Sequence, residues 1–334
     1  MVVRTPQRHQ TIGSLAARLL SRVALAFVLS CTLLAILPGC GSADSSSSAQ
    51  AAPAPAKKSA PKKSSDASGA AYKLPAEVKV PKTTSSSAPL IDVDGVDDGY
   101  VCAAAQSSSR LKFQVKCGDA AYNYDMPNDG TPALFPVNMG SGSYGFRIME
   151  NVEGSSYAEL EAAYLDVDLK SEFAPFLVPN IFCSYNTKSK CVAKARDLVK
   201  SSENEGEVVR EVCTFVAKAI TYDYDKAEVL AKSSGYIPDP DSTLAEGKGV
   251  CFDYAALTAA MLRSLGMPTK VITGYVSPDD LYHAWIMVYI NGTWESVLFS
   301  VKPNTWSRCD VTFASAGVSS VTGNGTTYTD RYTY

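Results

Sequence analysis

Histidine is nearly absent from this chain of 334 residues, which has only His9 and His283. Structural and catalytic zinc sites need closely spaced sets of histidine and cysteine, and neither a second nearby histidine nor a clustered pair of thiols is present. A glycine-rich phosphate loop of the Walker type is also missing. The sequence therefore predicts no metal site and no cofactor.

A long apolar run is missing as well. The run "VALAFVLSCTLLAIL" has fifteen residues, whereas a membrane-spanning helix needs roughly 20. Four arginines and no acidic residue precede it, which is typical of an export signal. The following "LPGC" resembles the lipobox of bacterial lipoproteins. We therefore expect residues 1–39 to be a signal peptide and Cys40 to be acylated, with the protein anchored to lipid on the extracytoplasmic face of the cell membrane; an ordinary thiol beside an uncleaved anchor is the alternative.

Large apolar residues are scarce in residues 40–90, which consist mainly of Ser, Ala, Pro and Lys. Such a composition cannot bury enough surface to offset the entropy of ordering, so this segment is predicted to be a disordered tether. Residues 1–39 and residues 40–90 each carry a net charge of +4, so residues 91–334 carry −11. A nucleic-acid-binding body would carry a basic patch, so no nucleic-acid partner is expected.

Residues 91–190 are predicted to form a small β-rich unit. Short apolar runs such as "RLKFQVKC" and "YGFRIMENV" alternate with turn-rich stretches such as "MPNDGTP", a pattern typical of antiparallel strands. From residue 191 the spacing of apolar residues becomes helical, as in "EGEVVREVCTFVAKAI". A second domain is therefore predicted over residues 191–334.

Cys251 opens a run of good helix formers that ends at Gly266, with Pro268 just beyond. A thiol at a helix N-terminus lies at the positive end of the helix dipole, which favours the nucleophilic thiolate. A buried apolar cysteine is the alternative interpretation. The stretches "TKVITGYV" and "YHAWIMVYI" follow as two predicted strands, and His283 stands at the start of the second.

A cysteine that begins a helix, followed by a strand and a histidine, resembles the transglutaminase-like branch of the papain-like thiol enzymes. The stretches "GVCFDYAALTAAMLRSLGMPTKVITGYV" and "HAW" carry the resemblance, over about residues 207–313. It implies an α+β fold, in which a nucleophile helix packs on an antiparallel sheet, and a catalytic Asp four residues after a Trp and followed by x-Thr. Trp294 leads to Leu298, but Trp306 leads to Asp310 and then Thr312. Asp310 is therefore the predicted acid, with "ESVLFSVKPN" as an inserted arm; a surface Asp or a catalytic dyad is the alternative.

The cysteine count is consistent with one free thiol. Apart from Cys31 in the signal, Cys40 and Cys251, an even number remains: Cys102, Cys117, Cys183, Cys191, Cys213 and Cys309. An even remainder in an exported protein suggests disulfides. We expect Cys102 to pair with Cys117 and Cys183 with Cys191, each pair flanking a short segment, and Cys213 and Cys309 are left over.

These features predict a membrane-anchored thiol enzyme. Cys251 would attack an amide carbonyl, His283 would carry the proton, and Asp310 would orient the imidazole. A backbone N–H at the start of the Cys251 helix is the expected oxyanion donor, and Tyr222, Tyr224 and Tyr236 are candidates to line the cleft. The expected substrate is a peptide, a protein or a cell-wall peptide. Acyl transfer from protein glutamine to amines, and a binding module that has lost catalysis, are the alternatives.

Overall fold

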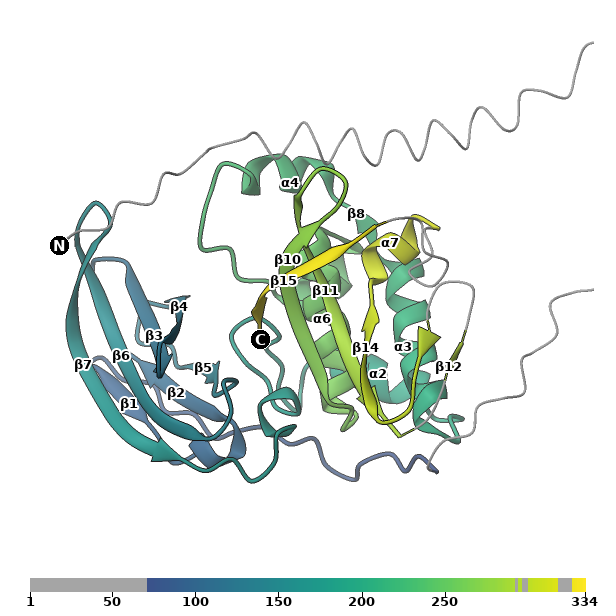
Figure 1. Cartoon of the computed structure of the whole chain (residues 1–334), viewed down its shortest axis with the longest axis horizontal. Coiled ribbons are helices and arrows are strands. Elements are labelled where there is room, and N and C mark those ends of the chain that lie inside the picture. Colours follow the sequence, from purple (N-terminus) through teal and green to yellow (C-terminus); the bar gives the residue numbers. More distant parts are fainter. Residues whose placement is uncertain (1–70, 292–293, 296–299, 318–325) are drawn as a thin grey trace, which may run out of the picture.

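The computed structural model describes residues 71–291, 294–295, 300–317 and 326–334. Strands dominate up to residue 167, and helices packed on a second sheet follow from residue 190 (Figure 1). The expected α+β architecture, with a β-rich unit ahead of a helix-and-sheet core, is confirmed. The predicted signal segment, Cys40 and most of the predicted tether lie outside the described residues.

Two antiparallel sheets pack face to face in the β-rich unit. One sheet has the order β1-β2-β5 and the other β4-β3-β6-β7. Their strands are β1 (Leu90–Asp92), β2 (Tyr100–Ala104), β3 (Leu111–Cys117), β4 (Ala120–Met126), β5 (Ala133–Pro136), β6 (Gly142–Glu153) and β7 (Ser156–Val167). Alternate residues point inward, and the stacked rings of Phe113 and Phe135, 4.3 Å apart, join the two sheets. Period-two burial of this kind is what the alternating sequence predicts. Short 3₁₀ turns flank the unit at η1 (Val96–Asp98) and η2 (Ala174–Phe176).

The predicted tether is too long, because the chain is already packed on the body from residue 71. Tyr72, Leu74, Val78 and Val80 pack against the core of the helical half. The Tyr72 hydroxyl donates to the Leu265 carbonyl at 3.2 Å. These few large apolar residues, spaced among Lys and Pro, were enough to anchor a segment whose average composition predicts disorder.

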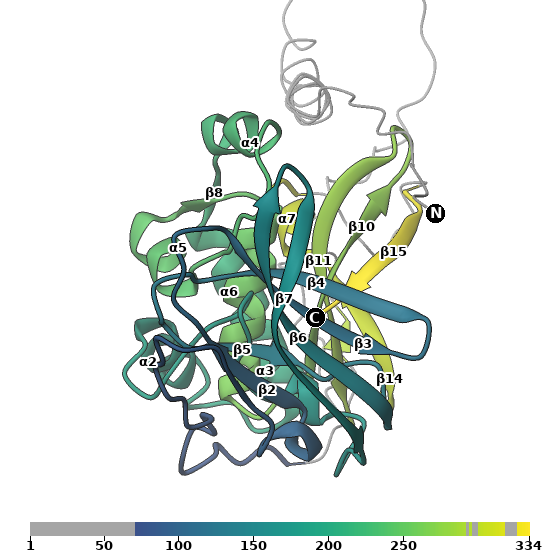
Figure 2. The same ribbon diagram turned by 90° about the vertical axis from the view of Figure 1, so that its left-hand side faces the viewer.

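The second half is a four-stranded antiparallel sheet with helices against it (Figure 2). The sheet order is β14-β11-β10-β15. Its strands are β10 (Thr269–Val276), β11 (Leu281–Ile290), β14 (Thr305–Cys309) and β15 (Tyr328–Thr333). The helices are α2 (Lys190–Leu198), α3 (Glu205–Ala219), α4 (Tyr224–Leu230), α5 (Pro240–Glu246), α6 (Cys251–Ser264) and α7 (Val311–Ser315). The short strands β8 (Thr221–Tyr222) and β9 (Lys248–Gly249) pair in parallel beside them.

Helix α6 is the centre of this half. Every residue from Asp253 to Ser264 is buried, and α2, α3, α5, β10 and β11 all contact it. Its sequence, rich in Ala and Leu on every side, fits a helix that is surrounded by protein. Among the helices that the structure describes, none is both long and apolar enough to cross a lipid bilayer.

The strand register is consistent with "ESVLFSVKPN", residues 295–304, as an inserted arm. Strand β11 pairs with β14, with Ile286 opposite Cys309 and Tyr289 opposite Trp306. The short strands β12 (Trp294–Glu295) and β13 (Ser300–Val301) pair with each other instead. The strand after β11 in the sheet is therefore the one that contains Trp306 and leads directly into Asp310.

A buried arginine joins the two halves at the C-terminus. The Arg263 guanidinium donates to the carbonyls of Val178, Thr269 and Tyr334 at 2.8–2.9 Å. The ring of Tyr334 also packs against the rings of Tyr124 and Phe182 from the β-rich side. Tyr334 thus contacts both halves and links the β sandwich to α6 and β10.

The structure corrects both predicted disulfides, since all four cysteines are free thiols. Cys102 lies outside the sandwich core that its neighbours Val101 and Ala103 enter, whereas Cys117 packs against that core. The Cys183 thiol donates to the Asn180 side chain at 3.4 Å, and the Cys191 thiol hydrogen-bonds to Asp241. Closeness in the sequence therefore did not predict which cysteines pair, because each of these thiols has other neighbours in the structure.

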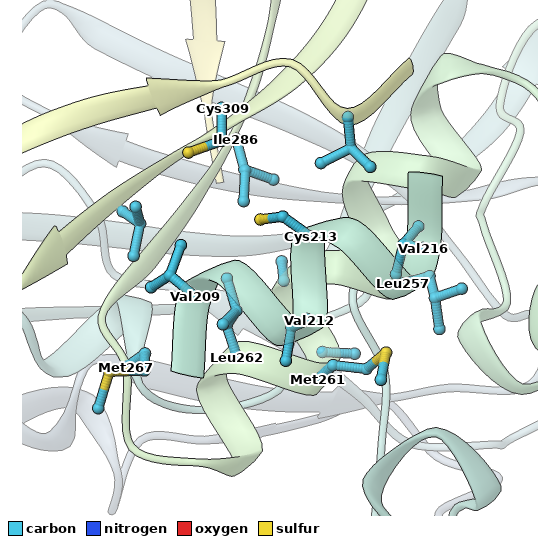
Figure 3. Close-up of a cluster of buried hydrophobic side chains, with 14 of the residues drawn as sticks. Val209, Val212, Cys213, Val216, Leu257, Met261, Leu262, Met267, Ile286 and Cys309 are labelled. Atoms are coloured by element: carbon cyan, nitrogen blue, oxygen red, sulfur yellow. The ribbon is translucent and has the colours of Figure 1, made fainter. Parts of the chain in front are cut away.

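Cys213 of α3 and Cys309 of β14 meet in the main core instead. Both thiols are fully buried, and Figure 3 shows them in the same cluster, on facing elements. A hydrogen bond to Cys309, together with burial, raises the pKa of the Cys213 thiol well above its usual value. The two thiols that the sequence left over are thus in contact.

We predict that Cys213 and Cys309 form a disulfide when the chain folds in the presence of an oxidising protein disulfide, which takes up the two electrons. Closing a loop of roughly 100 residues stabilises a native state by about 4–5 kcal/mol in the chain-entropy model. Peptide mapping of the full chain, denatured under alkylating and non-reducing conditions, should recover a linked Cys213–Cys309 peptide. Alkylation of both thiols in protein exported to the oxidising compartment would contradict the prediction.

Candidate active site

Cys251 lies half-buried at the first position of α6. The helix follows β9 directly, and Gly249 allows the close turn, since a Cβ there would lie 2.6 Å from the Asp253 Cβ. The first intrahelical bond runs from the Tyr254 N–H to the Val250 carbonyl. The N–H groups ahead of it belong to the first turn, which has no acceptor within the helix. The Cys251 thiol therefore lies beside backbone donors at the positive end of a buried helix.

A buried carboxylate fixes this turn. Asp253 is fully buried, and its Oδ2 accepts from the Val250 N–H and from Lys226 Nζ, both at 2.8 Å. Its Oδ1 accepts from the Tyr236 hydroxyl at 2.5 Å. An acidic side chain at the third position of a helix satisfies a donor that the helix cannot. Asp253 thus holds the loop before Cys251 against the start of the helix.

His283 lies near the start of β11, buried and opposite Gly274 of β10. Its Nε2 is 2.8 Å from Oδ2 of Asp310. Its ring stacks on Phe313 with centroids 4.7 Å apart. A side-chain hydrogen bond also joins the imidazole to Cys251. Contacts with Phe313, Asp310 and Cys251 therefore hold the ring in place.

Asp310 is fully buried at the junction of β14 and α7. Its Oδ1 caps α7 by accepting from the Phe313 N–H at 3.0 Å. Its Oδ2 accepts from the Tyr328 hydroxyl at 3.0 Å in addition to His283. The structure therefore brings together all three residues singled out by the sequence, in the order Cys251, His283, Asp310.

The charges around the imidazole favour its cationic form. Burial alone would lower the pKa of His283, because desolvation disfavours a cation. The negative charges of Asp310 and Cys251 and the hydrogen bonds to both outweigh that effect and raise the pKa from 6.5 to about 10. At neutral pH this raised pKa favours the protonated imidazole of His283.

A cleft of about 290 Å³ opens at Cys251 and His283. Residues of α4 and of the segment after it form one wall, and β10 with the start of β11 forms the other. Of the three tyrosines considered from the sequence, Tyr222 and Tyr236 line the cleft, and Tyr224 is exposed on α4. Burial first, and then the neighbouring Cys251, raises the pKa of Tyr222.

Sequence reasoning missed Asp253, Lys226, Phe313 and Tyr328. Asp253 carried a usable signal, as an acidic residue two positions after the cysteine in a helix that begins with apolar residues. Tyr328 carried none, because its contact with Asp310 depends on the pairing of β15 with β10. Among the described residues, no group of His, Cys, Asp and Glu side chains is arranged to hold a metal ion.

Residues 192–310 match the sequence profile of the transglutaminase-like superfamily. Over these residues the chain is similar to a transglutaminase-like core. The match begins in α2, ends at Asp310 and includes Cys251 and His283, so it agrees with the resemblance expected over about residues 207–313. The superfamily contains cysteine proteases and acyltransferases.

Two curated relatives match part of this chain. An uncharacterized protein of Mycobacterium leprae is 27% identical over 132 residues, which is 36% of this chain and 44% of that protein. A UPF0252 protein of Methanocaldococcus jannaschii is 29% identical over 136 residues, 38% of each chain. The matches thus span less than half the length of these relatives.

Two solved structures show partial similarity to this chain at low identity. A candidate cysteine protease of Cytophaga hutchinsonii is 19% identical, with a TM-score of 0.32, over 69% of this chain and 81% of that one. The periplasmic domain of TgpA from Pseudomonas aeruginosa is 14% identical, with a TM-score of 0.31, over 70% and 96%.

We predict that His283 of the transglutaminase-like core stays protonated well above neutral pH. In the full chain with His9→Gln, His283 is the only imidazole, so its ring C–H signals can be followed by NMR. Asp310→Asn should lower the pKa of His283 by about 1–3 units, because a stabilising negative charge is removed while burial persists. The control Asp279→Asn, at an exposed turn position, should leave it unchanged. Titration of His283 near 6.5 in the parent protein would contradict this interpretation.

Proposed function

We propose that the protein is a membrane-anchored, extracytoplasmic thiol enzyme that cleaves amide bonds of peptides or cell-wall peptides through a thioester on Cys251. The observation that carries the proposal is the hydrogen-bonded line from the Cys251 thiol through His283 to Asp310, which opens into a cleft. A binding module has no need of all three groups in this arrangement.

The proposed reaction has two steps. The Cys251 thiolate attacks the amide carbonyl and forms a C–S bond, and the resulting oxyanion lies near the N–H groups of the first turn of α6. As the C–N bond breaks, the proton on His283 passes to the leaving amine. A water molecule then attacks the thioester, His283 accepts its proton, and the free acid leaves. Asp310 orients the imidazole and stabilises its cationic form throughout.

Acyl transfer to an amine shares the same thioester, so the residues around Cys251 do not distinguish it from hydrolysis. Transfer needs an acceptor channel that keeps water from the thioester. We favour hydrolysis, because Ser233, which lines the cleft at Cys251, is exposed, so solvent reaches the cleft.

We expect Cys251→Ala to abolish both turnover and alkylation at mildly acidic pH, where ordinary thiols are protonated. Asp310→Ala should lower kcat by about 10²-fold or more, because the imidazole loses its orientation. The matched control Asp279→Ala should keep the parent rate. Equal losses for the two aspartates would contradict the role given to Asp310.

Product analysis tests the reaction class. A glutamine-containing peptide and a wall-type peptide are incubated with the full chain and excess primary amine, and the products are weighed by mass spectrometry. Free acid or cut peptide supports hydrolysis, and mostly amine adduct at modest amine concentration would replace it by acyl transfer. No turnover while Cys251 remains alkylatable would favour a binding module.

Membrane anchoring rests on the lipobox-like sequence around Cys40. Mass spectrometry of the protein from its native host should find Cys40 at the N-terminus, carrying acyl chains. Cys40→Ser should move the protein out of the membrane fraction or stall its processing, because a covalent lipid supplies the anchor. Recovery of a mature protein with an intact Met1 would falsify this part of the proposal.

A further inference from the structure

The cleft at Cys251 is lined by uncharged side chains. Ala227, Leu230 and Ala231 form one wall, and Leu281 and Tyr282 form part of the other. Apart from the catalytic pair Cys251 and His283, the described residues that line the cleft include no Asp, Glu, Lys or Arg. This is unusual for a body whose net charge is −11, so the charges must lie elsewhere.

The charged side chains of α4 either lie outside the cleft lining or form an ion pair. On α4, Asp225 and Glu228 are exposed and do not line the cleft. Lys226 on the same helix is bound to Asp253 at 2.8 Å. Helical spacing thus separates an apolar face at positions 227, 230 and 231 from a charged face at positions 225, 228 and 232.

Large apolar side chains are exposed at the cleft and on α4. Tyr282 lines the cleft and keeps 38% of its surface exposed, and its hydroxyl donates to Thr273 at 2.8 Å. Its ring therefore presents a fixed apolar face to solvent beside His283. Tyr224 and Val229 on α4 are two more of the large apolar side chains that the structure leaves exposed.

We propose that this cleft selects substrates with an uncharged, apolar side chain on the acyl side of the scissile amide, and that Leu230 and Tyr282 set the preference. The inference rests on the proposed function of Cys251. A charged side chain here would lose its hydration and gain no partner, whereas an apolar one would be transferred from water to an apolar wall. With about 290 Å³, the cleft has room for one or two side chains, since pockets for larger ligands start at roughly 300 Å³.

Chloromethyl ketones of acetyl-alanyl-phenylalanine, -lysine and -glutamate test the preference. All three alkylate a thiol with loss of chloride and differ only in one side chain. With the full chain, the phenylalanyl probe should alkylate Cys251 at least about 10-fold faster than either charged probe, the scale of discrimination that a hydrophobic pocket gives. Iodoacetamide, which has no side chain, reports the intrinsic reactivity of the thiol, and each rate is divided by the iodoacetamide rate.

Leu230→Lys and Val229→Lys form a matched pair, because each adds one lysine to α4. Leu230 lines the cleft, whereas Val229 is 65% exposed and does not. Leu230→Lys should slow the phenylalanyl probe and accelerate the glutamyl probe, while Val229→Lys should keep the parent order. Equal rates for the three probes, or equal effects of the two variants, overturn the selectivity while leaving Cys251 as the nucleophile. A Cys251 that is inert to iodoacetamide overturns the proposed function and this inference with it.

Discussion

The buried carboxylate of Asp310 is the constraint on which the active-site half depends. An ionised group without water must have its acceptor sites satisfied by protein donors, or its burial costs several kcal/mol. Asp310 meets this requirement with donors from β11, α7 and β15, through His283, Phe313 and Tyr328. One side chain therefore ties three elements together, and the position that it gives to the imidazole is a consequence of the same hydrogen bonds that stabilise the sheet edge.

The β-rich unit places none of Cys251, His283 and Asp310, but it contacts the cleft lining, since the ring of Phe182 packs on that of Phe252 with centroids 5.1 Å apart. Its sandwich has a separate core, and it meets the helical half where Tyr334 follows β15 and where Arg263 bonds to three carbonyls. Because β15 pairs with β10 along the strand that faces His283, fixing the C-terminus also fixes Tyr328 against Asp310. The role of the unit near Cys251 is thus mechanical, to hold a strand that carries one donor to the buried acid.

Much of the core could be predicted from the sequence. The positions of Cys251, His283 and Asp310 could be predicted too, because each of these residues lies at the end of a strongly patterned segment. The alternation in Thr269–Val276 and the run of helix formers after Cys251 match β10 and α6, and Trp306 gave the correct strand for Asp310. Strand β15 and the partners of Asp253 could not be predicted, since their roles arise from pairing between elements far apart in the sequence. The disulfide prediction failed for the same reason: Cys213 and Cys309 are nearly one hundred positions apart, yet their thiols meet.

Asp253 is a second buried carboxylate on which the site depends. Helix α4 has half-buried apolar residues but no fully buried one, so apolar burial holds it only weakly as a wall of the cleft. The ion pair between Lys226 and Asp253 supplies the attachment, and the same carboxylate fixes the turn before Cys251. Removing Lys226 would leave Asp253 buried with one charge partner fewer, a costly state. The position of the cleft wall and the position of the thiol are therefore not independent: a movement of α4 away from the cleft must also disturb the carboxylate at the start of α6.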